Sequence, residues 1–354
     1  MRPNTRAGLD VTWRCQWQCA HCFYRHDPRL HKPIDTPMNE IRDKLDQAQK
    51  GGLNHAVLDG YGEPSLCRNL TEILLECRGR GMATSMITNG ASPRRIYENC
   101  RELGMDHLHF STHGTEEVLT KISGDPKAHN RQITLKGWMQ KVAWPWRTNI
   151  AMQRLNVENI EAVVEQEIKL GTFHFVFLGF LPHYEWQQDL ADVRQVAAHP
   201  AELRPHIEAG AVKLRESGTY FTIRYHPFCH LNPEWWPHVT NARHVFVDPW
   251  EWNYELQVTD LQRLWAAARA VGDSHACREP CRQCIAYRHC GGWNRWMAEA
   301  FGGADLKAVT EVPDNYTSVW DREGGVFDLN PANVLSGTIG CGAPIRVLDS
   351  CEEE

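Results

Sequence analysis

The stretch Val11-Thr-Trp-Arg-Cys15-Gln-Trp-Gln-Cys19-Ala-His-Cys22 is the most informative part of this chain. It overlaps a short β-prone run at residues 8–12, and its cysteines have the spacing C-x3-C-x2-C. Iron–sulfur clusters are held by cysteine thiolates, normally four of them. A cluster bound by three cysteines keeps one iron open, and an exogenous molecule can coordinate there. The alternative is a zinc knuckle or three buried thiols, but zinc sites usually have a fourth ligand nearby.

Size and composition are those of an ordinary globular protein. The 354 residues are 42% hydrophobic and 23% charged, enough for one large domain or two smaller ones. No apolar run approaches the roughly 20 residues of a membrane span, and the first residues lack the apolar segment of a secretory signal. We therefore expect a cytoplasmic protein with no membrane partner. Thiols stay reduced in that compartment, so thirteen cysteines indicate metal ligation rather than disulfides.

The charge balance argues against nucleic acid as the main partner. The formal net charge is −6, and the sequence has no block rich in lysine or arginine. A cationic or neutral small molecule is easier to accommodate than a polyphosphate.

Strand-like and helix-like segments alternate through the first half of the chain. Each apolar, β-prone run is followed by an amphipathic stretch that stops at glycine, and such βα repeats form parallel sheets covered by helices. We expect six units, with strands near residues 8–12, 55–59, 83–88, 106–112, 147–155 and 172–180. The predicted fold is α/β: a partial (β/α)6 TIM-like barrel over residues 1–180, with its chemistry at the carboxyl ends of the strands.

The rest of the chain lacks this alternation. Residues 181–270 are rich in tryptophan, histidine and proline, and we expect them to form a connecting region that caps the substrate. Residues 271–354 contain a second cysteine group and are expected to form a smaller, loop-rich auxiliary-cluster domain.

The first cysteine motif, placed just after an N-terminal strand, resembles that of the radical S-adenosylmethionine (SAM) superfamily. The resemblance implies that Cys15, Cys19 and Cys22 bind a 4Fe–4S cluster whose open iron chelates SAM. An electron from the cluster then cleaves SAM to a 5′-deoxyadenosyl radical. It also implies a partial barrel fold and an external electron donor such as flavodoxin or ferredoxin.

Further motifs of the family follow on successive strands. Asp59-Gly-Tyr-Gly-Glu-Pro64 resembles the segment that contacts the SAM amino group, and Thr88-Asn-Gly90 and Ser111-Thr-His-Gly114 resemble the turns after the third and fourth strands. The alternative for each short glycine motif is a tight turn without a ligand. The resemblance implies SAM contacts at His21, Gly62, Glu63, Asn89, Ser111, Gln153 and Leu178.

The second cysteine group has the spacing C-x3-C-x2-C-x5-C and comprises Cys277, Cys281, Cys284 and Cys290. Its last three members resemble the auxiliary-cluster modules called SPASM and twitch, which bind one or two further 4Fe–4S clusters. A fourth ligand is expected from Cys277 or from Cys341. Asn294 stands where the full SPASM pattern has another cysteine, which favours a single auxiliary cluster. A structural zinc site is the alternative.

These features predict a radical SAM dehydrogenase that takes hydrogen from a small natural-product intermediate of an antibiotic-type pathway, such as an aminocyclitol, sugar or nucleoside-like compound. An auxiliary cluster can accept the second electron, so a two-electron alcohol oxidation is the leading hypothesis. A base is needed for the proton, and Asp248 and Glu251 are the candidates. The alternatives are maturation of a ribosomally made peptide, or redox-neutral epimerisation or decarboxylation. An epimerase requires a thiol hydrogen donor, for which Cys229 is the candidate.

Overall fold

A parallel sheet of eight strands forms the centre of the molecule. The computed structural model describes residues 6–22, 34–60, 62–182, 190–241, 275–276, 279–286, 290, 292–303 and 305–311. The strands follow one another in sequence order, and every neighbouring pair is parallel. They are β1 (Arg6–Asp10), β2 (His55–Asp59), β3 (Ala83–Thr88), β4 (His107–Ser111), β5 (Trp146–Met152), β6 (His174–Gly179), β7 (Tyr220–Arg224) and β8 (Val239–Thr240).

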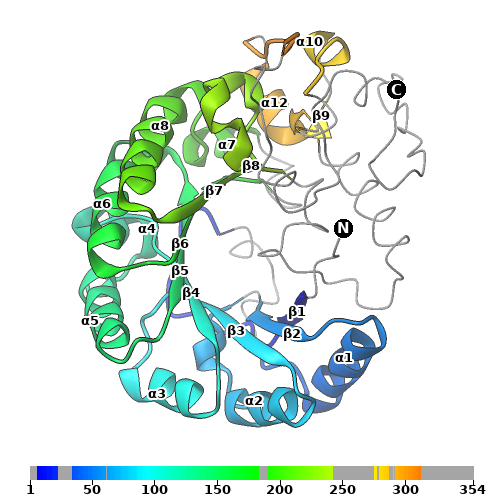
Figure 1. Cartoon of the computed structure of the whole chain (residues 1–354), viewed down its shortest axis with the longest axis vertical. Helices are drawn as coiled ribbons and strands as arrows, with labels where there is room; N and C mark the ends of the chain where they lie inside the picture. The colour runs from blue at the N-terminus through cyan, green and yellow to red at the C-terminus, as the bar shows by residue number, and fades with distance from the viewer. Residues whose placement is uncertain are drawn as a thin grey trace.

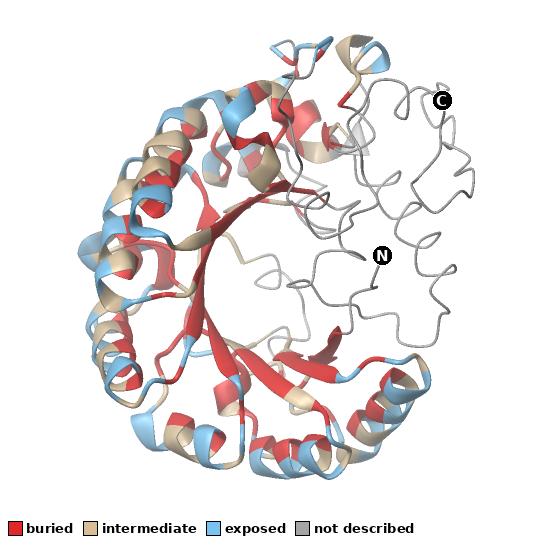
Figure 2. Cartoon of the chain, viewed as in Figure 1, coloured by how far each residue is buried: buried red, intermediate tan, exposed pale blue. Residues whose placement is uncertain are grey.

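The sheet curls, and helices cover its convex face (Figure 1). Two other helices, α4 (Glu116–Ser123) and α7 (Leu190–Val196), belong to separate, smaller buried clusters. The covering helices are α1 (Met38–Lys50), α2 (Leu70–Gly79), α3 (Arg94–Glu102), α5 (Ala128–Lys141), α6 (Ile160–Leu170) and α8 (Pro200–Ser217). Their buried sides face the sheet and their exposed sides face outward (Figure 2). The predicted α/β fold, a partial TIM-like barrel, is confirmed.

The strand count differs from the prediction, because the sheet continues beyond residue 180. β7 and β8 lie in the stretch that was expected to be a connecting region. β7 has the sequence Tyr-Phe-Thr-Ile-Arg, a β-prone run just after Gly218, which ends α8 with a φ of 71°. Two helices, α7 and α8, separate β6 from β7 and interrupt the regular βα spacing.

Apolar side chains of the strands pack under the helices. Leu9, Leu58 and Phe110 belong to one buried group, and Ile150 and Phe177 belong to a second. Because side chains alternate along a strand, the residues between them face the concave side of the sheet.

The concave side is polar at the amino end of the strands. Pairing along the sheet places Arg6 beside His55, and Arg147 beside both His109 and His174. All of these side chains are buried. Burial lowers the pKa of His55 to about 3, with a smaller contribution from Arg6. The interior of the half-barrel therefore holds neutral imidazoles beside guanidinium groups.

Trp235 and Trp236, two tryptophans of the predicted substrate cap, lie in the core. They are 2% and 5% exposed and belong to the short 3₁₀ helix η7 (Pro233–His238). The indole N–H of Trp236 donates to the carbonyl oxygen of Phe228 at 2.9 Å. These two rings pack under β7 and do not form a surface for stacking on a substrate.

The described part of the C-terminal region is small and packs against the barrel. It comprises β9 (His275–Ala276), α10 (Glu279–Arg282), β10 (Trp293–Asn294) and α12 (Arg295–Phe301), and β9 pairs with β10 in antiparallel fashion. Trp293, Met297 and Ala298 share a buried cluster with Val193 and Ala197, at and just after α7. In the described part of the chain, every helix is too short or too polar to cross a membrane. The cytoplasmic location stays a prediction.

Candidate active site

The three cysteines of the first motif lie on one loop at the carboxyl edge of the sheet, directly after β1. Cys15 is exposed, and Cys19 and Cys22 are half-buried. Two backbone hydrogen bonds fasten the loop to the end of α4, from Gln18 N to Ser123 O at 2.8 Å and from Ala20 N to Ile122 O at 3.2 Å. The thiols are therefore presented on a loop that is tied to the barrel.

The donor set of this loop fits an iron–sulfur cluster. Within the described ranges, no three Cys, His, Asp or Glu side chains converge closely enough to hold a single metal ion. A cluster spreads its thiolate ligands over several irons, so it needs no such convergence. The indole N–H of Trp17, between Cys15 and Cys19, is buried without a hydrogen-bond partner, which leaves a donor in the loop for a bound group.

Gly62 and Glu63 connect the loop after β2 to the cysteine loop. The backbone N–H of Glu63 donates to Arg14 O at 2.6 Å. A Cβ atom at position 62 would lie 2.2 Å from that same oxygen, so only glycine allows the two loops this close.

The carboxylate of Glu63 is buried in a hydrogen-bond network. Oε1 accepts from Ser65 N at 3.2 Å, Ser65 Oγ at 2.5 Å and Thr88 Oγ1 at 2.6 Å, and Oε2 accepts from Asn89 N at 2.6 Å. Burial raises the pKa of Glu63, and these four hydrogen bonds act in the opposite direction. The network fixes the end of β3 against the loop after β2, and Oε2 keeps acceptor capacity for a ligand.

Asn89 contacts the first cysteine. Its Oδ1 accepts from Ala91 N at 2.9 Å and from Gln16 Nε2 at 3.2 Å, which sets the orientation of the amide. Its Nδ2 then points at Cys15 Sγ, 3.9 Å away. The Thr88-Asn-Gly90 turn therefore supplies an N–H donor to a sulfur of the expected cluster.

His21 lies against the ends of β4 and β5. Gln153 Nε2 donates to His21 Nδ1 at 2.8 Å, and the His21 ring meets the His113 ring edge-on, with centroids 4.4 Å apart. Burial lowers the pKa of His21 to about 4, so the ring is neutral near pH 7. His113 Nδ1 accepts from Ala151 N at 3.1 Å. The sequence prediction missed His113, although it belongs to the quoted Ser111-Thr-His-Gly114 turn.

Ser111 and Leu178 end the fourth and sixth strands, as predicted, and both are half-buried. Leu178 pairs with Ala151 on one side and Arg224 on the other. All seven residues predicted to contact SAM thus lie at one edge of the sheet. Their role in binding SAM stays a prediction.

The second cysteine group is described in part. Cys281, Cys284 and Cys290 lie in the C-terminal region, and Cys229 lies close to them, in the 3₁₀ helix η6 (Phe228–His230) after β7. Two other predicted ligands, Cys277 and Cys341, lie outside the described residues, as do the two predicted bases, Asp248 and Glu251.

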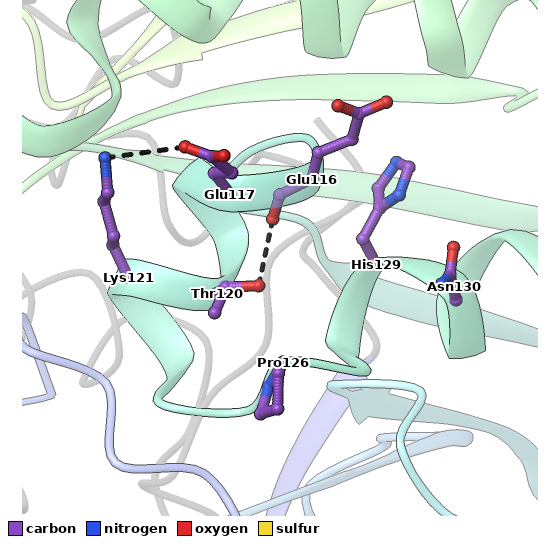
Figure 3. Close-up of a pocket in the computed structure, with 7 residues that line it drawn as sticks. All are labelled: Glu116, Glu117, Thr120, Lys121, Pro126, His129 and Asn130. Carbon is purple, nitrogen blue, oxygen red and sulfur yellow. Dashed lines mark hydrogen bonds and ion pairs between the residues drawn. The ribbon is translucent and has the colours of Figure 1, made fainter.

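A cavity of about 580 Å³ opens elsewhere, between α4 and α5 (Figure 3). Thr120 Oγ1 donates to Glu116 O at 3.2 Å in its wall, and Lys121 pairs with Glu117 at 3.9 Å. Its lining contains none of the predicted site residues, so this cavity is separate from the candidate site at the carboxyl edge of the sheet.

Solved structures with this fold include two forms of SuiB from Streptococcus suis. The form bound to precursor peptide SuiA is 16% identical, with a TM-score of 0.57 over 88% of this chain and 75% of that chain. The form bound to S-adenosylmethionine is 18% identical, with a TM-score of 0.47 over 62% of this chain and 47% of that chain. The structure of anSMEcpe with AdoMet and the Cp18Cys peptide is 13% identical, with a TM-score of 0.54 over 86% of this chain and 92% of that chain.

A family model agrees with the fold and with the cysteine loop. Residues 10–165, which contain Cys15, Cys19 and Cys22 and all but one of the predicted SAM contacts, match the model of the Radical SAM superfamily. Enzymes of this family use SAM and a 4Fe–4S cluster. The chain therefore contains a radical SAM domain over residues 10–165.

Proposed function

We propose that this chain is a radical SAM oxidoreductase that oxidises an alcohol on a small natural-product intermediate, such as an aminocyclitol or a sugar. When bound, the cluster and SAM supply a 5′-deoxyadenosyl radical, which removes hydrogen from an unactivated C–H bond. One observation carries the proposal: the second cysteine group lies close to a cysteine at the same edge of the sheet as the first group. Cys15 follows β1, and Cys229, close to Cys281 and Cys284, follows β7.

The protein's own side chains have distinct tasks in this proposal. Cys15, Cys19 and Cys22 hold the cluster, while Gly62 lets the neighbouring backbone approach closely. Glu63 Oε2 and the Gln153–His21 pair offer polar groups to SAM, and Leu178 offers an apolar surface. Ser111 supplies a hydroxyl at the end of β4.

The concave face suits a substrate with many hydroxyl groups. Asn149, Thr222 and Arg224 lie on this face toward its carboxyl edge, and each bears hydrogen-bonding groups. An auxiliary cluster on the second cysteine group would accept an electron from the substrate. Asp248 or Glu251 would take the proton, and flavodoxin or ferredoxin would reduce the first cluster.

A second candidate is the modification of a ribosomally made peptide. It is supported by two structures of this fold that contain peptides, SuiB with precursor peptide SuiA and anSMEcpe with the Cp18Cys peptide. The core position of Trp235 and Trp236 favours it too, since these rings do not form the aromatic cap expected for a compact ring substrate.

The test is an anaerobic turnover assay with SAM, dithionite and two panels of substrates, aminocyclitols and sugars in one and peptides in the other. We expect 5′-deoxyadenosine in wild type, and a small-molecule product that has lost two hydrogens. A product of unchanged mass would indicate epimerisation, and turnover of peptides alone would replace the small-molecule proposal. No 5′-deoxyadenosine from a protein with its cluster intact would refute the radical mechanism.

A further inference from the structure

We infer that Cys229, Cys281, Cys284 and Cys290 together hold the auxiliary iron–sulfur cluster, with Cys229 as the ligand that completes the set. This assignment rests on the auxiliary cluster of the proposed function and names its ligands. It replaces Cys277 and Cys341 with a cysteine that belongs to the barrel.

Packing brings Cys229 to the other three cysteines. One buried cluster of side chains contains Cys290, with Cys284 and Cys229 packed against it. A neighbouring cluster has Cys281 and, again, Cys229 against it. Cys229 is therefore the cysteine shared by the two groups, between the motif cysteines and the end of β7.

Electrostatic interactions agree with this packing. Cys229 lies within electrostatic range of the thiols of Cys281 and Cys284. Cys290, which is buried, interacts in the same way with Cys229 and Cys284. Cys229 therefore lies near each of the other three cysteines and links them into one group.

Backbone N–H groups already point at these sulfurs. The segment 305–311 supplies two of them: Val309 N donates to Cys284 Sγ at 3.3 Å, and the backbone of Lys307 hydrogen-bonds to Cys229. The backbone of Phe228 hydrogen-bonds to Cys290. Hydrogen bonds to sulfur tune the potential of iron–sulfur clusters, and buried thiols in an ordinary core do not require them.

The assignment also bears on the alternative role of Cys229 as a hydrogen-donating thiol. A sulfur bound to iron has no S–H hydrogen to donate, so ligation of Cys229 excludes its alternative role in an epimerase. Since Cys229 directly follows β7, ligation also ties the electron acceptor to the edge that carries Cys15.

The test isolates the auxiliary cluster in a Cys15→Ala/Cys19→Ala/Cys22→Ala background. Iron, sulfide and zinc contents and EPR spectra are measured after anaerobic reconstitution. We expect about four irons in this background, and loss of that iron when Cys229→Ala is added. Cys277→Ala and Cys341→Ala should leave the iron in place, as should Cys77→Ala, which changes a buried cysteine of α2.

Folding and ligation are separated by a second variant. Cys229→Ser preserves the size of the side chain, and its far-UV circular dichroism should match that of the background while its iron content falls or its EPR spectrum changes. Full iron with an unchanged spectrum in both Cys229 variants would overturn the assignment. Zinc in place of iron, or iron loss confined to Cys277→Ala or Cys341→Ala, would overturn it too.

The outcomes distinguish this inference from the wider proposal. If the background variant holds no iron while wild type cleaves SAM, the auxiliary cluster is absent: the ligand assignment fails and the oxidation loses its electron acceptor, while the radical mechanism stands. If the background variant keeps about four irons but wild type makes no 5′-deoxyadenosine, the radical chemistry fails and the ligand assignment stands.

Discussion

The two cysteine groups of this molecule are built in opposite ways. Cys15, Cys19 and Cys22 follow one another on a single loop and are exposed or half-buried. The second group draws Cys229 from the end of the barrel and its other members from beyond residue 280, and Cys290 is buried. In the first group, the side chain of Asn89 and the backbone of Trp17 contact Cys15, and in the second, the backbone of Val309 contacts Cys284 and that of Lys307 contacts Cys229.

This difference suits the two expected tasks. A cluster that binds SAM needs an accessible iron, and a contiguous loop leaves one side open. A cluster that only accepts electrons can be enclosed, and the packing of distant segments encloses it. The first group should therefore control radical formation, while the second should control the redox outcome and the cohesion of the C-terminal region.

The largest expected effect is the loss of 5′-deoxyadenosine formation when the first cysteine group, but not the second, is changed. The Cys15→Ala/Cys19→Ala/Cys22→Ala variant should form 5′-deoxyadenosine only at background level, because it lacks the cluster that reduces SAM. Cys284→Ala should still form it, with product oxidation lost. Chromatography of nucleosides after incubation with SAM and dithionite measures both. Equal losses of 5′-deoxyadenosine in the two variants would show that radical formation depends on both cysteine groups alike.

The second prediction concerns the barrel that carries both cysteine groups, and how its stability depends on pH. Burial lowers the pKa values of His55, His107 and His174 far below 6.5, so these imidazoles are neutral in the folded state. The unfolded chain takes up their protons as the pH falls below about 6.5, so stability is complete above that pH and is lost below it. From about pH 6 to about pH 5 these three imidazoles should together lower the free energy of unfolding by roughly 3–4 kcal/mol, and other buried imidazoles, such as those of His109 and His113, add to the fall.

Urea denaturation of the triple cysteine variant, measured before reconstitution with iron and sulfide so that neither cluster is present, gives this slope without acid loss of a cluster. His55→Gln is the matched variant, because an amide can keep the hydrogen bond that His55 Nε2 makes to Ser85 Oγ at 2.8 Å. It should reduce the slope by roughly 1 kcal/mol per pH unit, the contribution of one imidazole. An unchanged slope would show that these rings do not couple folding to pH.

The third prediction concerns Glu63, which connects two loops of the open site. Glu63→Gln places an amide N–H₂ where a carboxylate oxygen now accepts from Asn89 N or from Ser65 N. A buried donor then faces another donor, which should cost roughly 1–3 kcal/mol. The control is Glu72→Gln, at a site about half exposed where the ion pair with Arg42 contributes only ~0–1 kcal/mol. Equal urea midpoints for the two variants would contradict the role of the Glu63 network.

The sequence predicts the site of the first cysteine group well, because each of its motifs is a short, continuous stretch of the chain. The C-x3-C-x2-C spacing, Gly62 and Asn89 each follow directly after a strand, and parallel strands bring their carboxyl ends to one edge. The βα alternation is also local, since it depends on the side-chain period of each element. The fold class and the position of the loop were therefore predictable.

What the sequence did not reveal depends on tertiary packing. Cys229 looks like a lone cysteine until α10 and the segment 305–311 are packed against η6. Trp235 and Trp236 look like a surface for stacking until β7 and α8 bury them. His113 was missed because it lies inside a turn, and only the folded structure shows that its ring contacts the ring of His21. Contacts between segments that are far apart in the chain leave no repeating pattern in the sequence, so sequence patterns cannot predict them.

The smallest expected effect sharpens the contrast between side-chain and backbone donors. Asn89→Ala removes the N–H that points at Cys15 Sγ. A hydrogen bond to sulfur stabilises the reduced, more negative cluster, so its loss should lower the potential of the SAM-site cluster. Radical formation should slow by about tenfold or less, the equivalent of one ordinary hydrogen bond.

The matched variants are Gln16→Ala and Lys307→Ala. Gln16→Ala loses a bond to Asn89 Oδ1 but leaves the donor to Cys15 in place. Lys307→Ala keeps its backbone donor to Cys229, so neither cluster should change potential. Redox titration followed by EPR, with the two clusters resolved by comparison with the triple cysteine variant, measures all three. A shift in Lys307→Ala as large as that in Asn89→Ala would mean that the side-chain charge, and not the hydrogen bond to sulfur, sets the potentials.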